Sequence, residues 1–143
     1  MSLERRRLIK AFGAEIVLCG PASLLPAGLA CMAPGVRLTY DIREAIRDAD
    51  VVMMLRVQLE RQHEAAFPAG EYFQFYGLRL EHLDLIKPDA LVMHPGPINR
   101  GREISSEVAD SQRSVILNQV ENGVAVRMAV LERILTSHAE TAH

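Results

Sequence analysis

The 143-residue sequence has no apolar run close to the ~20 residues of a membrane-spanning helix. Its net charge of −2, from 16 basic and 18 acidic residues, lacks the positive excess of a nucleic-acid-binding surface. Two cysteines, Cys19 and Cys31, are too few for a disulfide framework, and the basic start at residues 4–7 lacks the apolar core of a signal peptide. We therefore expect one cytoplasmic domain that contacts neither membrane nor nucleic acid.

Common signatures of nucleotide-binding and covalent chemistry are also missing. The sequence contains no P-loop, no GxGxxG run, no Ser/His/Asp arrangement and no paired carboxylates. Its five histidines are scattered at spacings that do not suit a metal ion, so we expect no metal and no other cofactor. These absences favour a site that binds and orients its substrates without forming a covalent intermediate.

What is present is a pattern of short apolar runs and helical segments. The runs at 14–19, 51–55 and 90–93 predict strands buried on both faces, and 36–39 predicts a short edge strand. Helical spacing is found at 3–12, 41–47 (capped by Asp41), 78–86 and 114–135, with a kink or close packing expected at Gly123. Residues 103–108 suit one or two helical turns, 63–70 a loop, and 136–143 a frayed polar tail. Short links between strand, helix and strand predict a three-layer α/β/α fold with a parallel sheet.

Two groups of residues follow predicted strands and could carry function. Arg56 and Gln58 come after the run at 51–55; an arginine fork and an amide could together hold an amino acid, or could be solvated at the start of a surface helix. Pro95 and Pro97 stiffen the loop after the run at 90–93, a place where open α/β sheets bind ligands; the alternative is a tight turn without a ligand.

Three further side chains near these groups are assigned structural roles. Glu60 and Arg61 suit an ion pair that orders their loop, and exposed pairs of this kind contribute ~0–1 kcal/mol. His94, at the end of a strand, is interpreted as a hydrogen-bonded structural histidine.

Two segments together, LRVQLER at 55–61 and VMHPGPINRGREI at 92–104, resemble the aspartate-binding half of aspartate carbamoyltransferase catalytic chains. Stretches at 12–18, 23–26 and 108–111 support the resemblance, which covers nearly the whole chain. It implies a Rossmann-like carbamoyltransferase half-domain and a transferase that moves a carbamoyl group from carbamoyl phosphate to L-aspartate, a step of pyrimidine biosynthesis.

The resemblance also implies roles for individual residues. Arg56 would take a carboxylate of aspartate, and Gln58 would position the substrate near its amino end. Pro95 and the carbonyl of Gly96 would lie against the carbamoyl group, and the Gly96–Pro97 bond would be cis. Glu60 and Arg61 would order their loop when the domains close.

The sequence departs from this family in what it lacks. Family chains are about twice as long, and their carbamoyl-phosphate domain with its Ser-Thr-Arg-Thr motif has no counterpart here, so 1–143 is interpreted as one aspartate-binding domain. A first strand, which the family places between the strands predicted at 14–19 and 51–55, also has no counterpart. Its absence would leave two unsatisfied inner edges. We therefore expect the isolated chain to be inactive.

Two alternatives remain open. The chain could be a non-catalytic homologue that acts as a binding or regulatory module of a full-length transcarbamoylase or a dihydroorotase, and family catalytic chains form homotrimers. It could also act on another amino acid, as ornithine carbamoyltransferase does, although that relative has a cysteine-bearing loop in place of HPGP.

Overall fold

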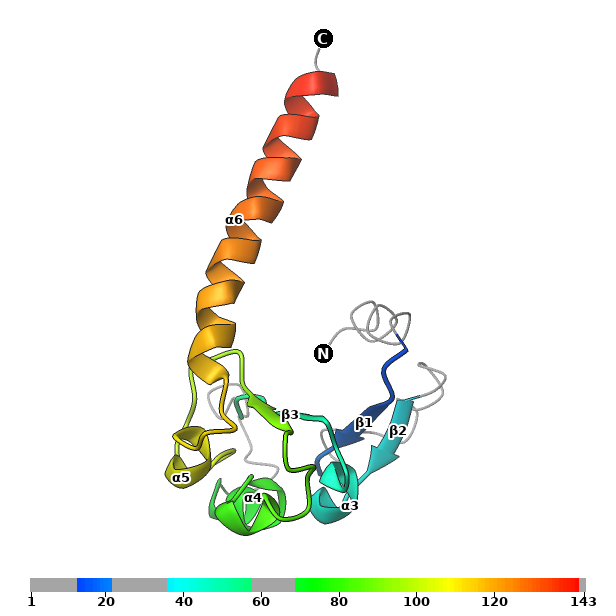
Figure 1. The fold of residues 1–143 in the computed structure, drawn as a ribbon, viewed down its shortest axis with the longest axis vertical. Coiled ribbons are helices and arrows are strands. Elements are labelled where there is room, and N and C mark those ends of the chain that lie inside the picture. Colours follow the sequence, from blue (N-terminus) through cyan, green and yellow to red (C-terminus); the bar gives the residue numbers. More distant parts are fainter. Residues whose placement is uncertain (1–12, 22–35, 58–68, 142–143) are drawn as a thin grey trace.

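The computed structural model describes residues 13–21, 36–57 and 69–141, with side chains described as far as 136. The described elements in chain order are β1 (Ile16–Cys19), β2 (Val36–Thr39), α3 (Ile42–Ile46), β3 (Val51–Met53), α4 (Ala69–Tyr76), the 3₁₀ turn η2 (Leu80–His82), β4 (Leu91–Met93), α5 (Ser106–Ala109) and α6 (Ile116–Thr141). Figure 1 shows a body of short elements from which α6 extends. The predicted helix at 3–12 and residues 63–68 of the predicted loop lie outside the described residues.

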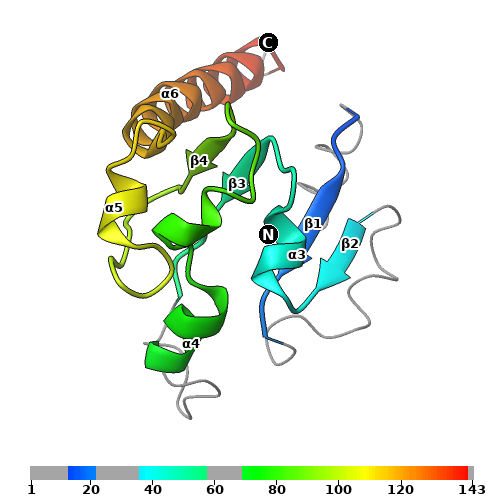
Figure 2. The ribbon, with the colours of Figure 1, turned by 60° about the horizontal axis from the view of Figure 1, so that its bottom comes forward.

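The strands pair in parallel, which confirms the predicted α/β fold with parallel pairing. β1 pairs with β2, with Ile16 opposite Val36. β3 pairs with β4, with Val52 opposite Val92. In the described part of the chain these pairs form two separate two-stranded sheets, so a single continuous sheet is not seen. The break lies between β1 and β3, the position at which the resemblance implies a missing strand (Figure 2).

The prediction that these strands are buried on both faces is wrong for the described chain. Val52 and Val92 are buried, but Val51 and Met53 are 48% and 47% exposed, and β1 is half-buried throughout. Side chains alternate between the two faces of a strand, so the exposed pair marks an uncovered face of β3. The apolar composition of a run therefore did not distinguish a strand covered on one face from a strand covered on both.

The core forms around β4. The N–H of Val92 donates to the carbonyl of Arg113 (2.8 Å), and the N–H of Val115 donates to the carbonyl of Val92 (2.9 Å), so the chain entering α6 covers the outer edge of this strand. Eleven buried apolar residues make up the core cluster: Ile42, Ile46, Val52, Leu78, Ile86, Ala90, Val92, Ile104, Val108, Ala109 and Ile116.

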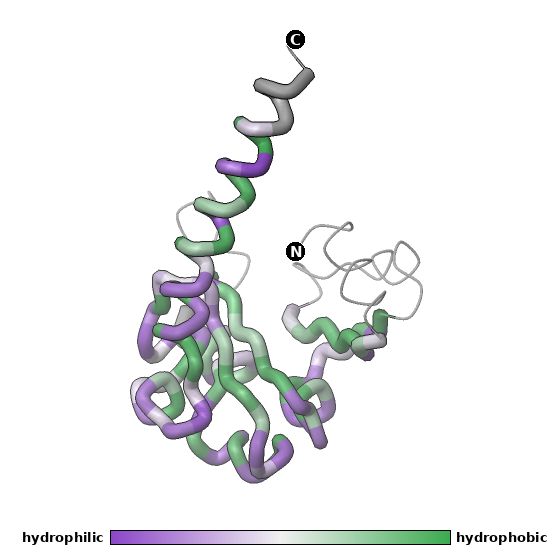
Figure 3. The backbone as a smooth tube through the Cα atoms, turned by 45° about the horizontal axis from the view of Figure 1, so that its top comes forward, coloured by the Kyte–Doolittle hydropathy of each residue, from purple (hydrophilic) through white to green (hydrophobic). Residues whose placement is uncertain are grey.

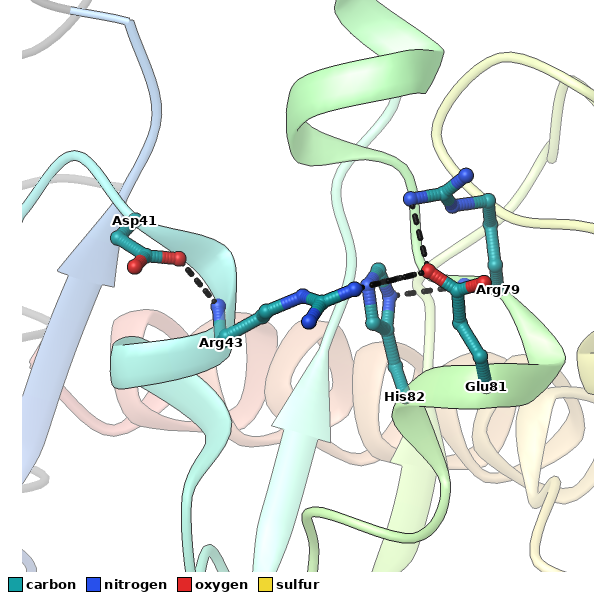
Figure 4. A network of polar contacts seen from close by, with 5 residues as sticks. All are labelled: Asp41, Arg43, Arg79, Glu81 and His82. Atoms are coloured by element: carbon teal, nitrogen blue, oxygen red, sulfur yellow. Dashed lines mark hydrogen bonds and ion pairs between the residues drawn. The ribbon is translucent and has the colours of Figure 1, made fainter.

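Helix α3 begins where its sequence predicts. The carboxylate of Asp41 accepts a hydrogen bond from the N–H of Arg43 (2.8 Å), which satisfies a free donor of the first turn. The Arg43 guanidinium then contacts Glu81 (3.3 Å), which also contacts Arg79 (3.0 Å). Figure 4 shows this network joining α3 to η2.

The helix predicted over 78–86 is largely absent. Only the 3₁₀ turn of η2 forms, because Leu78 is drawn into a bridge with Ile104. The N–H of Leu78 donates to the carbonyl of Glu103 and the N–H of Ser105 donates to the carbonyl of Leu78, both at 2.9 Å. These tertiary hydrogen bonds replace those of a first helical turn. The next helix, α5, is the short turn expected at 103–108, capped by the side chain of Ser105.

Two helix boundaries also differ from prediction. Helix α4 begins at Ala69, within the segment predicted as a loop. Helix α6 continues to Thr141, into the predicted frayed tail, and runs unbroken through Gly123. A methyl group built on Gly123 would have one neighbour within 4 Å, the Arg127 guanidinium at 3.8 Å, so neither the kink nor the close packing expected there is seen.

Helix α6 projects from the body (Figure 1), and apolar residues alternate with polar ones along it (Figure 3). Nine of its large apolar side chains are at least 40% exposed: Leu117, Val120, Val124, Val126, Met128, Val130, Leu131, Ile134 and Leu135. Exposed apolar patches of this extent mark interaction surfaces.

Candidate functional site

The candidate site lies where two neighbouring parallel strands end. β3 and β4 run in register, with Met53 opposite Met93, and the N–H of Met54 donates to the carbonyl of Met93 (2.9 Å). Arg56 follows the end of β3, and the loop from Pro95 follows the end of β4. Because the carboxyl ends of parallel strands share one edge of a sheet, the predicted arginine and the predicted loop occupy the same rim.

Arg56 lines a cavity with a volume of about 510 Å³. Residues 17–21, at and after the end of β1, and residues 51–57, which are β3 and the segment after it, form two of its walls. The apolar side of α3 and two tyrosines of α4 form the others. Arg56 is half-buried there. A partly desolvated guanidinium in the lining of a largely apolar cavity is suited to hold a carboxylate, since its charge is less screened than at an open surface.

The other titratable groups of this cavity are held neutral. Burial, with a smaller effect from Asp41 and Glu44, raises the pKa of the Cys19 thiol to about 11. Burial likewise raises the pKa of Tyr72 to about 12. A thiol with a raised pKa is a poor nucleophile, so Cys19 is a structural residue here.

The loop after β4 has a constrained backbone. The Gly96–Pro97 bond is cis, as the resemblance implies, and Gly96 has a φ of +67°, which favours glycine. A methyl group on Gly96 would lie 3.2 Å from Cγ2 of Val120, so the loop lies directly against α6. Pro95 and Pro97 are exposed. The backbone of this loop is therefore held in one defined conformation next to α6.

Buried polar side chains hold this loop from behind. The N–H of Gly96 donates to Nδ1 of His94 (2.9 Å), and the N–H of Asn99 donates to Oε1 of Glu103. The backbone N–H of His94 donates to Oε1 of Gln119 on α6 (2.8 Å). The prediction of His94 as a hydrogen-bonded structural histidine is confirmed. Glu103 and Gln119 were not predicted, because their separation from His94 in the sequence gives no sign of contact.

The remaining predicted site residues, Gln58, Glu60 and Arg61, lie outside the described residues. Across the residues that are described, no group of three or more His, Cys, Asp or Glu side chains could hold a metal ion. In the same part of the chain, no helix combines the length and apolarity needed to span a membrane.

Comparison with known proteins decides the family. Residues 6–134 match the family model described as the aspartate/ornithine carbamoyltransferase Asp/Orn-binding domain. The chain belongs to this family. Within it, a relative from Solibacter usitatus (strain Ellin6076), an aspartate carbamoyltransferase catalytic subunit, is 79% identical over 128 residues, which are 90% of this chain and 42% of the relative. The catalytic subunit of Rhizobium johnstonii is 58% identical over 91% of this chain and 41% of its own length.

Solved structures place the fold in the same carbamoyltransferase family. The ornithine carbamoyltransferase of Burkholderia thailandensis E264 matches with a TM-score of 0.73 and 26% identity, covering 92% of this chain and 42% of that chain. The Pyrococcus furiosus enzyme matches with a TM-score of 0.65 and 26% identity over 82% of this chain and 41% of its own. The carbamoyltransferase domain described here thus spans about two fifths of the length of the relatives it matches.

Proposed function

We propose that this chain is the aspartate-binding half of an aspartate carbamoyltransferase. The observation that supports this most directly is the 79% identity with an aspartate carbamoyltransferase catalytic subunit across 90% of the chain. The loop chemistry favours aspartate over ornithine as the substrate, because HPGP at 94–97 contains no cysteine. The likeness to ornithine carbamoyltransferase structures, at 26% identity, supports the shared domain fold and leaves this preference unchanged.

In the proposed reaction the amino group of L-aspartate attacks the carbonyl carbon of carbamoyl phosphate. A C–N bond forms, the C–O bond to phosphate breaks, and the amine loses a proton to give N-carbamoyl-L-aspartate and phosphate. Arg56 would hold a carboxylate of aspartate and Gln58 would position the substrate near its amino end. The rate of such a transfer comes from orientation and from stabilisation of the tetrahedral state by fixed dipoles.

The loop supplies some of those fixed dipoles. The carbonyls of Pro95 and Gly96 would accept hydrogen bonds from the carbamoyl NH₂, and Pro97 fixes their direction. Glu60 and Arg61 would order the adjacent loop. The phosphate would be bound by a second domain, so we expect the chain alone to show no turnover and at most weak aspartate binding. We also propose that the complete enzyme is a cytoplasmic homotrimer.

The test uses this chain and a chimera in which residues 6–134 replace the matching segment of the Solibacter usitatus enzyme. The chain alone should be inactive with carbamoyl phosphate and aspartate, and the chimera should be active. In the chimera, Arg56→Ala should raise the KM for aspartate by about 10- to 100-fold. This is the loss of affinity expected when a hydrogen bond between charged groups is removed. Arg37→Ala, which removes an exposed arginine of β2, is the matched control. Robust turnover by the chain alone, or an inactive but folded chimera, would contradict the proposal.

A second candidate is favoured by the exposed apolar surface of α6. As a non-catalytic binding module, the chain would attach through this helix to a full-length transcarbamoylase, a dihydroorotase or a regulatory chain. Analytical ultracentrifugation of the chain with and without each purified partner distinguishes the candidates. A chain that stays monomeric in every mixture, together with an active chimera, would exclude the module.

A further inference from the structure

Two ionisable side chains lie completely buried behind the loop at 95–99. His94 and Glu103 both have 0% exposure, and Nε2 of His94 lies 3.4 Å from Oε1 of Glu103. Each also accepts an N–H of the loop, His94 from Gly96 and Glu103 from Asn99. Residues 95–99 contain two prolines without an N–H, so three backbone donors remain and this pair binds two of them.

The hydrogen bonds define the state of the imidazole. Nδ1 of His94 accepts the N–H of Gly96, so Nδ1 carries no proton and the proton of the neutral ring is on Nε2, facing Glu103. The imidazole therefore holds the start of the loop and lies 3.4 Å from Glu103, which holds the far end of the loop at Asn99. The cis Gly96–Pro97 bond lies between these two attachments.

Stability alone does not account for this pair. Nε2 of His94 and Oε2 of Glu103 are buried without a hydrogen-bond partner among the described residues. Incompletely satisfied buried polar groups cost free energy, and apolar side chains of similar volume often serve as well or better. What apolar side chains could not do is accept the N–H groups of Gly96 and Asn99 and so fix the direction of the carbonyls between them.

We propose that His94 and Glu103 are positioning residues that hold the Pro95 and Gly96 carbonyls in the orientation needed to bind the carbamoyl group. The proposal rests on the proposed function, since it assumes that this loop faces the reacting group. Neither side chain touches substrate, because both are completely buried behind the loop. Gln119 supplies a third attachment, because its side chain accepts the backbone N–H of His94. This hydrogen bond couples the residue that precedes the loop to α6.

The first experiment measures amide hydrogen exchange by NMR in this chain, without any substrate. His94→Leu should increase the exchange rate of the Gly96 amide by at least about 10-fold, and Glu103→Ala should do the same for Asn99, since each loses its acceptor. His94→Asn and Glu103→Gln keep an acceptor oxygen and should retain most of the protection. Unchanged exchange in both Leu and Ala variants would overturn the proposal whatever the function of the chain.

The second experiment measures kinetics in the chimera. His94→Leu and Glu103→Ala should lower kcat by about 10- to 100-fold, as expected for a small displacement of orienting groups, with the KM for aspartate changed less than about 3-fold. Glu103→Gln should restore most of kcat. If the chimera with native His94 is active and folded His94→Leu retains full kcat, the positioning role is wrong while the proposed function stands; if the native chimera is inactive, the proposed function itself fails.

His82 provides a matched control for both experiments. It is also a buried histidine whose Nδ1 accepts a backbone N–H, that of Arg79 (3.2 Å), but it belongs to η2 and its Nδ1 holds that turn instead of the loop at 95–99. His82→Asn should leave kcat within about 2-fold and leave exchange at Gly96 unchanged. An equal loss of kcat in the His82 and His94 variants would show a general loss of stability and overturn the positioning role.

Discussion

The guanidinium of Arg100 meets the carboxylate of Asp110 at two points, with Nη1–Oδ2 at 2.7 Å and Nη2–Oδ1 at 2.8 Å. Arg100 follows the loop at 95–99, and Asp110 ends α5. Nη1 of Arg100 also donates to the carbonyl of Ser106 (3.3 Å). The pair therefore fastens the segment after the loop to a neighbouring helix.

This contact predicts a pH effect of defined sign. The hydrogen bond from Arg100 holds the pKa of Asp110 below its ordinary 3.8. The ionised Asp110 carboxylate therefore stabilises the folded chain fully above pH 3.8. This stabilisation is lost as the pH falls through the lower pKa that Asp110 has in the folded chain. Carboxyl NMR titration should show the Asp110 pKa rising toward 3.8 in Arg100→Gln. The same pKa in both proteins would mean that the two-point contact does not form in solution.

Two glycines should respond to alanine with opposite sign. Gly101 has a φ of +76° with open space around it, so Gly101→Ala should lower the free energy of unfolding by about 1–2 kcal/mol through backbone strain alone. Gly123 lies inside α6 with one distant neighbour, so Gly123→Ala should raise helix stability by up to about 1 kcal/mol. Urea denaturation of both variants measures the difference, and a shift of the same sign in both would contradict the backbone argument.

Adjacent segments of the chain show why the sequence predicts some elements and not others. Asp41 and the spacing that follows it specify α3 through local hydrogen bonds, and that helix is found where expected. Over 78–86 the apolar residues are also spaced as in a helix, but only a 3₁₀ turn forms. The backbone N–H and carbonyl of Leu78 instead form hydrogen bonds with Glu103 and Ser105, about 25 positions later. Contacts of that range leave no periodic signal in the sequence.

The candidate site divides in the same way. Arg56 and the loop from Pro95 follow apolar strand-forming runs, so their common edge could be predicted from parallel pairing. The attachment of that loop to Glu103 and Gln119 could not, since it depends on how α6 and the segment before α5 fold back. The partial exposure of β1 and β3 could not be predicted from composition either, because a strand covered on one face and a strand covered on both can have the same apolar residues.

Two nearby leucines should separate the contribution of the core from that of the surface. Leu78 is completely buried in the core cluster, whereas Leu80 is 57% exposed. Leu78→Ala should cost about 2–5 kcal/mol of unfolding free energy, and Leu80→Ala should stay within about 0.5 kcal/mol. Urea titration followed by circular dichroism measures both. Similar losses in the two variants would mean that the core is not centred where the structure places it.

Acid should destabilise the chain through its buried histidines. Burial lowers the pKa of both His82 and His94 below the ordinary 6.5, and the charge of Arg79 adds to the effect at His82. A lowered folded-state pKa means that stability is complete above about 6.5 and falls as the pH drops toward the folded-state values. Thermal unfolding between pH 7.5 and 5 should show a fall in Tm that is smaller in His82→Asn. A Tm that rises toward pH 5 would contradict this assignment.

The thiol of Cys19 should react slowly. Raising its pKa from 9.0 to about 11 leaves about a hundredth of the ordinary thiolate population at a given pH, before any effect of restricted access. In a Cys31→Ser variant, the rate of alkylation by iodoacetamide at pH 8 should therefore be at least about 100-fold below that of a free thiol peptide. Reaction at the peptide's rate would show that the cavity wall around Cys19 opens readily.

The break between the two sheets affects the order in which parts of the protein unfold. Among the described residues, the β1–β2 pair adds only the partly buried Cys19 at the margin of the core cluster, whereas the fully buried members come from α3, β3, β4 and the segments around them. Two-stranded sheets are marginally stable by themselves. Native-state hydrogen exchange should therefore find two cooperative units: amides of β1 and β2 open at low denaturant, and those of β4 exchange only with global unfolding. The molecule would thus melt from its N-terminal side, with the rim carrying the Pro95 loop as the last structure to be lost.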